Sequence, residues 1–257
     1  MSRGSPQVGL AAGREVCVVL PTYNERDNVE RIALAILGAL PQAKLLIVDD
    51  SSPDGTGELA DGLAARESRV SVVHRPGKEG LGAAYRDGFR RALDDPAVQA
   101  VVQMDADFSH DPATLPTLLG RLMGDADLVL GTRYMPGGRT VGWPWHRKLI
   151  SRAGTLFART VLLLPYRDLT GGYKAWRREL LESIRMREAS ASGYGFQVEM
   201  TWWAHRRGAT IAELPIVFRE REHGESKMHG SIVREAFLMV LRLRWHAITG
   251  GWRRADR

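Results

Sequence analysis

The chain has 257 residues, of which 44% are hydrophobic and 26% charged, as expected of a globular protein large enough to bury a core. No stretch approaches the roughly 18 uncharged apolar residues that a membrane-spanning helix requires. The net charge of +6 indicates an anionic partner such as an acidic lipid or a phosphorylated substrate, whereas nucleic acid is disfavoured because the seven tryptophans are not interleaved with Lys and Arg.

The N-terminal residues 1–14 are Gly-rich and lack the apolar stretch of a signal peptide, so we expect a flexible tail there. The single cysteine, Cys17, lies within an apolar run and has no partner for an internal disulfide. Both features favour a reducing, cytoplasmic location.

Strands and helices are predicted to alternate through the first half of the chain. Short β-branched runs predict the strands, and apolar residues at helical spacing predict the helices between them. The predicted strands cover residues 15–20, 44–48, 70–74 and 100–104, and the predicted helices cover 24–40, 56–66 and 81–93. We expect Pro21 to end the first strand. This alternation predicts an α/β fold with a mostly parallel, Rossmann-like central sheet flanked by helices.

The pattern loosens after residue 107. A fifth strand is predicted at 127–131, a helix at 148–164 and a late strand at 211–219, with loops at 136–144 and 220–230. The sequence has no internal repeats or low-complexity blocks. It therefore predicts one domain over residues 15–230, preceded by the tail 1–14 and followed by a C-terminal helix and basic tail over 231–257.

Polar and charged segments follow the predicted strands, and they are expected to meet at the carboxyl edge of a parallel sheet. Asp105 and Asp107 come directly after the fourth strand. Mg²⁺ and Mn²⁺ typically bind one or two carboxylates and complete their coordination with water and phosphate oxygens, so this pair is a candidate metal site. Alone, it fits a strand cap and turn better than a metal site. His110 fits a turn into a helix better than a metal ligand.

Five motifs fall in the order found in inverting GT-A glycosyltransferases of family 2, and the chain resembles this family over roughly residues 15–230. Within the family, the pattern is most similar to that of the polyprenyl (dolichyl) monophosphate mannose synthases. The motifs are Val19-Leu20-Pro21-Thr22-Tyr23-Asn24-Glu25, Val48-Asp49-Asp50-Ser51-Ser52-Pro53-Asp54-Gly55-Thr56, Asp105-Ala106-Asp107, Gly131-Thr132-Arg133-Tyr134 and Gly224-Glu225-Ser226-Lys227.

The resemblance implies that the first two strand-end loops and the acidic motif bind the guanosine diphosphate of the donor. The matching residues are Pro21, Tyr23, Glu25, Val48, Asp50, Asp105, Ala106 and Asp107. A tyrosine offers a flat apolar face and a glutamate accepts hydrogen bonds. Asn24-Glu25 also fits the N-terminus of a helix with an acid in its first turn, and both roles can hold. Asp49 can instead brace the loop.

The resemblance also implies cations that hold the phosphate groups of donor and acceptor. Arg133, Arg221 and Lys227 match these positions and, with Asp107, are the predicted catalytic residues. Without the family pattern, Arg221 and Lys227 would fit a solvated charged loop. The acceptor-side candidates are Lys174, Gln197 and Ser226, although Gly171-Gly172-Tyr173-Lys174 departs from the Ser or Ala and Arg of many relatives.

The reaction implied by the resemblance is the inverting transfer of mannose from GDP-mannose to a polyprenyl phosphate, with Mg²⁺ or Mn²⁺ as cofactor. Three alternatives stay open: glucosyl transfer to the same lipid, transfer to a saccharide, and a sugar-nucleotide-binding module without transferase activity. The complete set of acids and bases argues against the last.

The C-terminal helix bears on how the chain would reach a lipid in a bilayer. Residues 231–245 are apolar over most of the helix circumference, with Arg and Trp interspersed. Such an amphipathic helix can lie in a membrane interface or pack on the sheet, and the sequence favours neither. We expect peripheral association with the cytoplasmic face of the membrane, with an integral-membrane partner protein as one source of further anchoring.

Overall fold

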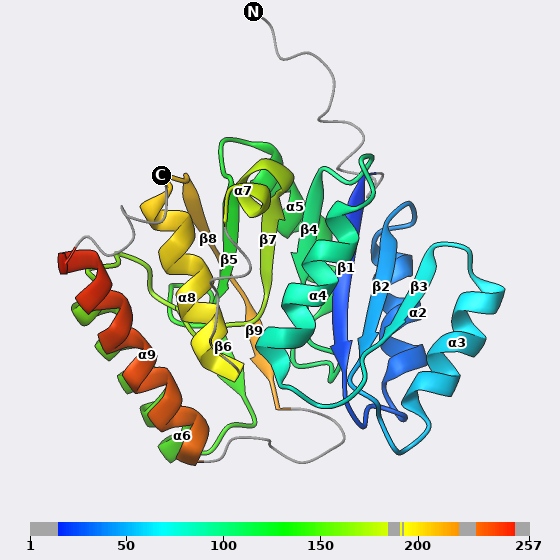
Figure 1. The fold of residues 1–257 in the computed structure, drawn as a ribbon, viewed down its shortest axis with the longest axis horizontal. Coiled ribbons are helices and arrows are strands. Elements are labelled where there is room, and N and C mark those ends of the chain that lie inside the picture. The colour runs from blue at the N-terminus through cyan, green and yellow to red at the C-terminus, as the bar shows by residue number, and fades with distance from the viewer. Residues whose placement is uncertain (1–14, 185–190, 192, 221–229, 250–257) are drawn as a thin grey trace, which may run out of the picture.

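A seven-stranded sheet forms the centre of the molecule in a computed structural model that describes residues 15–184, 191, 193–220 and 230–249 (Figure 1). Its strand order is β3-β2-β1-β4-β7-β5-β8, and β7 runs antiparallel to both of its neighbours. The strands are β1 (Val16–Thr22), β2 (Lys44–Asp49), β3 (Val70–His74), β4 (Ala100–Gln103), β5 (Leu128–Thr132), β7 (Lys174–Arg177) and β8 (Ile211–Pro215). A separate parallel pair is formed by β6 (Arg139–Val141) and β9 (Val217–Arg219).

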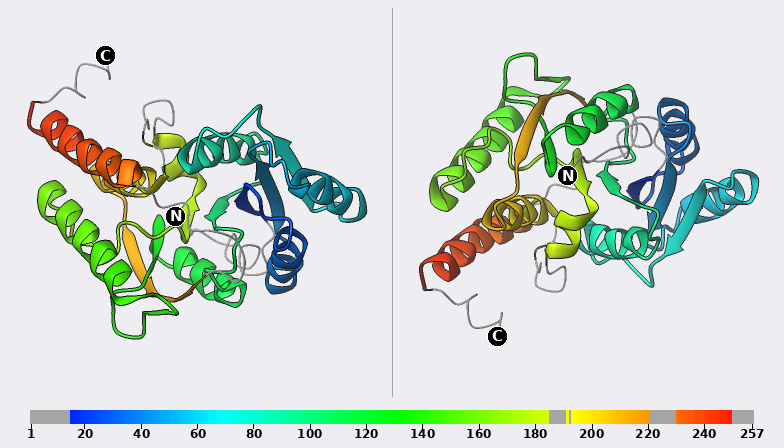
Figure 2. Two further views of the ribbon diagram at one scale, coloured as in Figure 1. Left: turned by 90° about the horizontal axis from the view of Figure 1, so that it is seen from below. Right: turned by 90° about the horizontal axis from the view of Figure 1, so that it is seen from above.

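Helices cover both faces of this sheet, as the views from its two ends show (Figure 2). Alternation along β1 explains why: Val16, Val18 and Leu20 join one apolar cluster, while Cys17 and Val19 join the other. The first cluster includes α2 (Val29–Ala39), α3 (Thr56–Arg66) and α5 (Leu115–Met123), which follows a short 3₁₀ turn at Pro112–Thr114. The second includes α4 (Leu81–Leu93), α6 (Trp145–Leu162), α7 (Arg178–Ser183), α8 (Gly193–Arg206) and α9 (Gly230–Thr249).

The C-terminal helix α9 packs on α8 and lies beside α6 at one end of the sheet (Figures 1 and 2). Met239, Val240 and Leu243 are buried in the same apolar cluster as the sheet. The rings of Phe157 on α6 and Phe237 on α9 stack with centroids 4.5 Å apart. Of the two arrangements that the sequence left open, packing on the domain is therefore observed, while the outer side of α9 stays exposed and apolar.

The predicted alternation of the first half is confirmed, but two boundaries there were wrong by two residues or more. β1 continues through Pro21 to Thr22. It pairs with β4 only as far as Val19, so one side of β1 is unpaired at the proline, where a missing N–H is tolerated. Helix α2 begins at Val29 rather than at residue 24, because the intervening residues turn onto the loop after β2.

The second half differs more from the prediction. The predicted strand 211–219 is two strands, since β8 ends at Pro215 and β9 pairs with β6 instead of the central sheet. The loop predicted at 136–144 contains β6, and the helix predicted at 148–164 begins at Trp145 and ends at Leu162. The elements α5, α7, α8 and β7 were not predicted. Helix α8 is buried on every side from Gly195 to Ala204, so it lacks the polar face that marks a surface helix.

Candidate active site

The carboxyl ends of β1, β2 and β4 meet at one edge of the sheet, and the loops there carry most of the predicted nucleotide residues. Thr22 at the end of β1 lies beside Asp49 at the end of β2, and Val19 lies beside Gln103 at the end of β4. The predicted convergence of these loops is therefore observed, in the position where open α/β sheets bind ligands.

The first two loops are tied together by hydrogen bonds. The Glu25 backbone N–H donates to the Thr56 hydroxyl at 2.9 Å. Asp49 accepts hydrogen bonds from the Thr22 hydroxyl at 3.0 Å and from both the backbone N–H and the hydroxyl of Ser52. Asp49 thus braces the loop from within, which leaves the loop surface to other side chains.

Tyr23 and Glu25 lie on the first loop with different surroundings. The Lys78 ammonium lies 4.0 Å from the centroid of the Tyr23 ring, so a cation from the loop after β3 reaches the aromatic face. The buried Glu25 carboxylate accepts a hydrogen bond from the Asn28 amide at 2.9 Å. Asn28, not Asn24, stands at the N-terminus of α2, and Pro21 is buried at the end of β1.

The predicted nucleotide residue Asp50 is held by a buried arginine. The Arg75 guanidinium donates to Asp50 at 2.5 Å, and it also contacts Asp87 at 2.7 Å and Glu79 at 2.6 Å. Burial raises the pKa of the Asp50 carboxyl, and the hydrogen bond from Arg75 only partly offsets this. Val48, its predicted neighbour in the site, is a fully buried core residue of β2.

The acidic pair is arranged by the residues around it. The Tyr85 hydroxyl on α4 donates to Asp105 at 3.0 Å, and the Ser109 backbone N–H donates to Asp107 at 3.0 Å. A Cβ atom at Gly172 would lie 3.2 Å from the Asp105 carboxylate, so the loop before β7 passes close to this acid. Ala106 is buried between the two acids.

The acidic pair fits a hard divalent cation that completes its coordination with phosphate and water. Among the described residues, no group of three or more His, Cys, Asp or Glu side chains could hold a metal by itself. His110 lies beside Asp105: its Nδ1 accepts from the Asp105 backbone N–H at 3.3 Å and lies 3.9 Å from a carboxylate oxygen, and its ring stacks on Tyr173. Burial lowers the pKa of His110 despite the nearby carboxylates, so the ring is held neutral.

Arg133, at the end of β5, forms a bidentate ion pair with Asp168. Its Nε and Nη2 donate to the two Asp168 oxygens at 2.7 and 2.8 Å, and Nη2 also donates to the Thr170 hydroxyl. Burial acts to raise the pKa of Asp168, but the charge and hydrogen bonds of Arg133 lower it below its usual range. The rings of Trp143 and Phe218 each lie 5.3 Å from the guanidinium carbon. The predicted phosphate-binding cation is thus fixed in orientation.

Lys174 and Gln197 lie inside the molecule between β7 and α8. The Lys174 ammonium donates to the Gln197 carbonyl at 2.7 Å and to the Thr201 hydroxyl at 2.9 Å. Gln197 accepts a hydrogen bond from the Gln103 amide at 2.6 Å. Burial lowers the pKa of Lys174 to about 7. In this structure both acceptor-side candidates belong to an interior polar network that joins α8 to the sheet.

Three other predicted residues fall outside the described part of the chain: Arg221, Ser226 and Lys227. The structure therefore brings the predicted nucleotide residues on the loops after β1, β2 and β4 to the same edge of the sheet as Arg133. The roles of Arg221, Ser226 and Lys227 stay predictions. The last described residue before them, Glu220, is ion-paired with Arg147 on α6.

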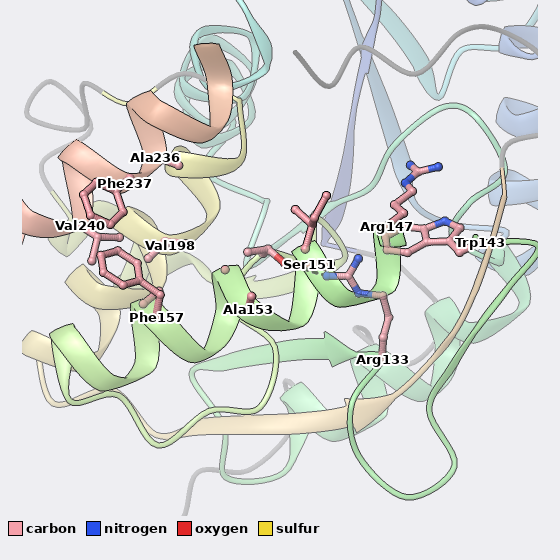
Figure 3. Close-up of a pocket in the computed structure, with 14 residues that line it drawn as sticks. Arg133, Trp143, Arg147, Ser151, Ala153, Phe157, Val198, Ala236, Phe237 and Val240 are labelled. Atoms are coloured by element: carbon pink, nitrogen blue, oxygen red, sulfur yellow. Dashed lines mark hydrogen bonds between the residues drawn. The ribbon is translucent and has the colours of Figure 1, made fainter. Parts of the chain in front are cut away.

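An apolar cavity of about 440 Å³ lies between α6, α8 and α9 and reaches Arg133 (Figure 3). Phe157, Val198 and Phe237 line one end, and Arg133, Trp143 and Arg147 line the other (Figure 3). Arg147 Nε and Trp143 Nε1 are buried, and neither has a hydrogen-bond partner within the part of the chain that the structure describes. The cavity thus combines an apolar body with unused donors at one end.

Sequence reasoning missed several residues of this arrangement. Tyr85 sits on a helix as an ordinary apolar position, and Asp168 lies in a loop with no motif of its own. Trp143 and Arg147 belong to a stretch that had been expected to be largely loop. Arg75 and Lys78 lie in the basic segment that follows the third strand, which could have been a signal for both, although not for their partners.

The fold and this edge of the sheet define a class of enzyme, and the comparisons with known proteins agree. The chain belongs to glycosyl transferase family 2, whose model matches residues 17–185. The predicted family and the GT-A-type fold are thereby confirmed.

Two relatives are similar over most of their length. The polyprenol monophosphomannose synthase of Mycolicibacterium smegmatis is 47% identical over 224 residues, which cover 87% of this chain and 84% of that protein. The undecaprenyl-phosphate mannosyltransferase of Micrococcus luteus is 46% identical over 237 residues, which cover 91% of this chain and 97% of that protein.

A solved structure shares the fold at lower sequence similarity. Glucosyl-3-phosphoglycerate synthase from Mycobacterium tuberculosis, in a complex with Mn²⁺, UDP-glucose and phosphoglyceric acid, superposes with a TM-score of 0.70. It is 23% identical, and the match covers 95% of this chain and 85% of that one.

Proposed function

We propose that this glycosyltransferase moves mannose from GDP-mannose to the phosphate of a polyprenol and inverts the anomeric centre to give polyprenyl β-mannosyl phosphate and GDP. The two relatives above 45% identity are named for the transfer of mannose to polyprenyl phosphates, and they support both the sugar and the lipid. The donor-side loops support a sugar nucleotide.

The observation that carries the lipid acceptor is the apolar cavity between α6, α8 and α9. Its aliphatic and aromatic walls suit an isoprenoid chain, and its other end has the Arg133 and Arg147 guanidiniums for a phosphate. Arg147 Nε and Trp143 Nε1, which have no hydrogen-bond partner among the described residues, are donors of the kind that phosphate oxygens satisfy. A soluble saccharide would gain little from such walls, which disfavours that alternative.

Asp105 and Asp107 would hold Mg²⁺ or Mn²⁺ together with the donor diphosphate. Bound there, the cation supplies Lewis-acid stabilisation of the charge that develops on the leaving GDP. Tyr85 positions Asp105 by its hydrogen bond, and the Ser109 backbone positions Asp107. Tyr23, Glu25 and Asp50 are proposed to recognise the guanosine.

The acceptor does not require a general base. A phosphate monoester has a second pKa near 6, so its attacking oxygen is largely anionic at pH 7. The task of the protein is to align two anionic substrates, and Arg133 is suited to this because Asp168 fixes its guanidinium. Arg221 and Lys227 are proposed to add positive charge, and Ser226 to lie near the acceptor.

Membrane association is proposed to be peripheral. No helix among the described residues is both long and apolar enough to cross a bilayer. The outer sides of α6 and α9 expose Trp145, Leu149, Leu156, Leu163, Phe237, Leu238, Leu241, Trp245 and Ile248. Of these residues, Phe237 lines the apolar cavity, so lipid entering from a bilayer there would meet an apolar surface. An integral-membrane partner would add to this anchoring.

Product formation tests the proposal directly. Purified protein is incubated with labelled GDP-mannose, polyprenyl phosphate and Mn²⁺, and the organic phase is assayed for a mild-acid-labile labelled lipid. Parallel reactions contain UDP-glucose, a mannoside acceptor or EDTA. We expect label in lipid from GDP-mannose alone, and its loss with EDTA.

The other outcomes identify the alternatives. Lipid labelled only from UDP-glucose would establish glucosyl transfer, and label in the mannoside would establish a saccharide acceptor. Tight GDP-mannose binding without transfer to any acceptor would contradict the proposal in favour of a binding module.

A further inference from the structure

We propose that Arg152, Arg159 and Arg167 form a second anion site, separate from the acceptor cavity, which binds the phosphate headgroups of anionic phospholipids at the membrane surface. This inference rests on the proposed function, because it concerns how the enzyme meets the bilayer that holds its acceptor. It names the bulk lipid class at the membrane surface and the site that binds it, whereas the proposed function names only the acceptor lipid and an apolar surface.

The site is a polar cavity of about 540 Å³ on another face of α6 from the apolar cavity. Arg152, Thr155, Leu156 and Arg159 line it from α6, and Arg167 lines it from the segment that follows the helix. The apolar cavity is lined instead by Gly154, Phe157 and Ala158 among others, which lie on the adjacent helix face. The two cavities share Arg133 as a common wall.

The three arginines form no ion pair with any carboxylate of the described residues. The Arg152 guanidinium lies 5.5 Å from the Tyr134 ring centroid, and Arg159 Nη2 lies 3.5 Å from the Pro165 carbonyl oxygen. By contrast, Arg66, Arg90 and Arg147 each pair with an acid. Glu213 accepts a hydrogen bond from the Arg167 backbone N–H at 2.7 Å, and the fourth arginine of the cavity, Arg133, is paired with Asp168. Three guanidiniums without an ion-paired acid among the described residues attract an anion, and arginine matches the geometry of phosphate oxygens.

Leucines alternate with these arginines along the same side of α6. Leu149, Leu156 and Leu163 recur every seven residues, and Arg152 and Arg159 lie between them. At 3.6 residues per turn, Leu149, Arg152, Leu156 and Arg159 fall within about 80° of the helix circumference. Leu163 follows the end of α6 in a left-handed conformation. The three leucines are 59%, 63% and 66% exposed, which is unusual for so regular an apolar row.

This mixture favours a bilayer over a soluble phosphate compound as the occupant. Leucines that stand out of the surface beside arginines can enter the acyl region while the guanidiniums stay at headgroup level. A soluble phosphate would use the arginines and leave the leucine row in water. Each basic residue near an anionic surface contributes to binding, so this site should discriminate between charged and neutral lipids.

Vesicle flotation tests the site. Full-length protein is mixed with vesicles of phosphatidylcholine, or of phosphatidylcholine with about one third phosphatidylglycerol, a composition chosen to provide the surface charge. The double variant Arg152→Gln/Arg159→Gln is compared with Arg66→Gln/Arg121→Gln, which loses the same charge on α3 and α5. Wild-type protein should bind the anionic vesicles more tightly, and the first variant should lose this preference by about tenfold or more. The control variant should keep it.

Two results would overturn the inference. Unchanged binding of the Arg152→Gln/Arg159→Gln variant to anionic vesicles would show that the bilayer does not occupy the site. This conclusion would hold even if, in a parallel titration, inorganic phosphate bound to wild type and not to the variant. Equal losses in both variants would show that total charge, and not this site, governs binding.

Transfer to a short-chain, water-soluble polyprenyl phosphate separates this inference from the proposed function. The Arg152→Gln/Arg159→Gln variant should retain wild-type turnover with that acceptor. Lack of transfer by wild type would count against the proposed function, whereas vesicle binding would still decide the anion site.

Discussion

The donor side and the acceptor side of this molecule are built by different means. On the donor side, the loops after β1 and β2 are joined by short polar contacts such as those of Asp49 and Thr56, and Arg75 fixes Asp50. On the acceptor side, helices enclose an apolar cavity, and polar groups gather only at its inner end. Under the proposed function, this difference would make the site rigid toward a nucleotide and permissive toward a lipid chain.

Arg133 lies where the two sides meet. It lines the apolar cavity, and its orientation depends on Asp168 and on the aromatic rings around it. The contrast between the two sides predicts that some substitutions affect donor chemistry for every acceptor, while others affect only the lipid.

The largest effect is expected from Asp107→Asn. Loss of one of two metal carboxylates should lower transfer by at least about a hundredfold with either a long or a short acceptor, since stabilisation of the leaving GDP is lost. The melting temperature should change little. Transfer assays and thermal unfolding measure both, with Asp125→Asn as an exposed acid control. Near wild-type transfer would remove Asp107 from the proposed site.

Arg133→Lys should have the next largest effect. A lysine cannot reproduce the two parallel hydrogen bonds to Asp168, so the cation would lose its fixed orientation. We expect kcat/KM for polyprenyl phosphate to fall by about ten- to a hundredfold, as typical for a mispositioned binding group. The Kd for GDP, measured by calorimetry, should stay within about twofold of the wild-type value. An equal loss of GDP affinity and of kcat/KM for polyprenyl phosphate would place Arg133 on the donor side.

Gly154→Leu should impair the lipid side alone. A Cβ at Gly154 meets no atom within 4 Å, and the residue lines the apolar cavity, so a leucine there would occupy space meant for the isoprenoid. KM for long-chain polyprenyl phosphate should rise by about tenfold, the effect of roughly two buried methylene groups. KM for GDP-mannose should not change.

Gly120→Leu on α5 is the matched control, because a Cβ there also meets open space. Both variants gain helix propensity and should be at least as stable as wild type. A Gly154→Leu enzyme with an unaltered acceptor KM would show that the chain does not enter this cavity.

The smallest expected effect is a pH dependence of the unfolding free energy that arises from the buried Lys174. Its pKa is about 7 in the folded state and near 10.4 when unfolded, so the unfolded chain binds more protons between these values. The unfolding free energy of wild type relative to Lys174→Met should therefore rise with pH across this window, by about 1 kcal/mol per pH unit, and be constant below it. Urea unfolding at several pH values measures this. A profile parallel to that of the exposed control Lys44→Met would refute the assignment.

The alternating first half of the fold followed from sequence because each element there has a simple period. β1, β2 and β4 are apolar runs, and α2 and α4 bury one face. Helix α8 was not predicted because burial on all sides removes the periodic spacing of its apolar residues. Strand β7 was not predicted because it begins with Lys174, and a lysine is usually a surface residue.

The candidate-site residues that belong to sequence motifs could be predicted. Those that position another residue through a contact distant in the sequence could not. Asp105, Asp107 and Arg133 lie at strand ends, which is where the sequence placed them. The ion pair of Arg133 with Asp168 spans 35 positions of the chain and depends on tertiary packing alone. The cavity arises from three helices that no local pattern could join.

Photolabelling with a polyprenyl phosphate that carries a diazirine in its second isoprene unit tests the two-sided account most directly. The cross-linked peptides are mapped by mass spectrometry in the presence of GDP and Mn²⁺. The account predicts labels within 150–158 on α6 and 236–240 on α9, and their loss with excess unlabelled lipid phosphate. Competable labels confined to α2, α3 or the strand-end loops would contradict it.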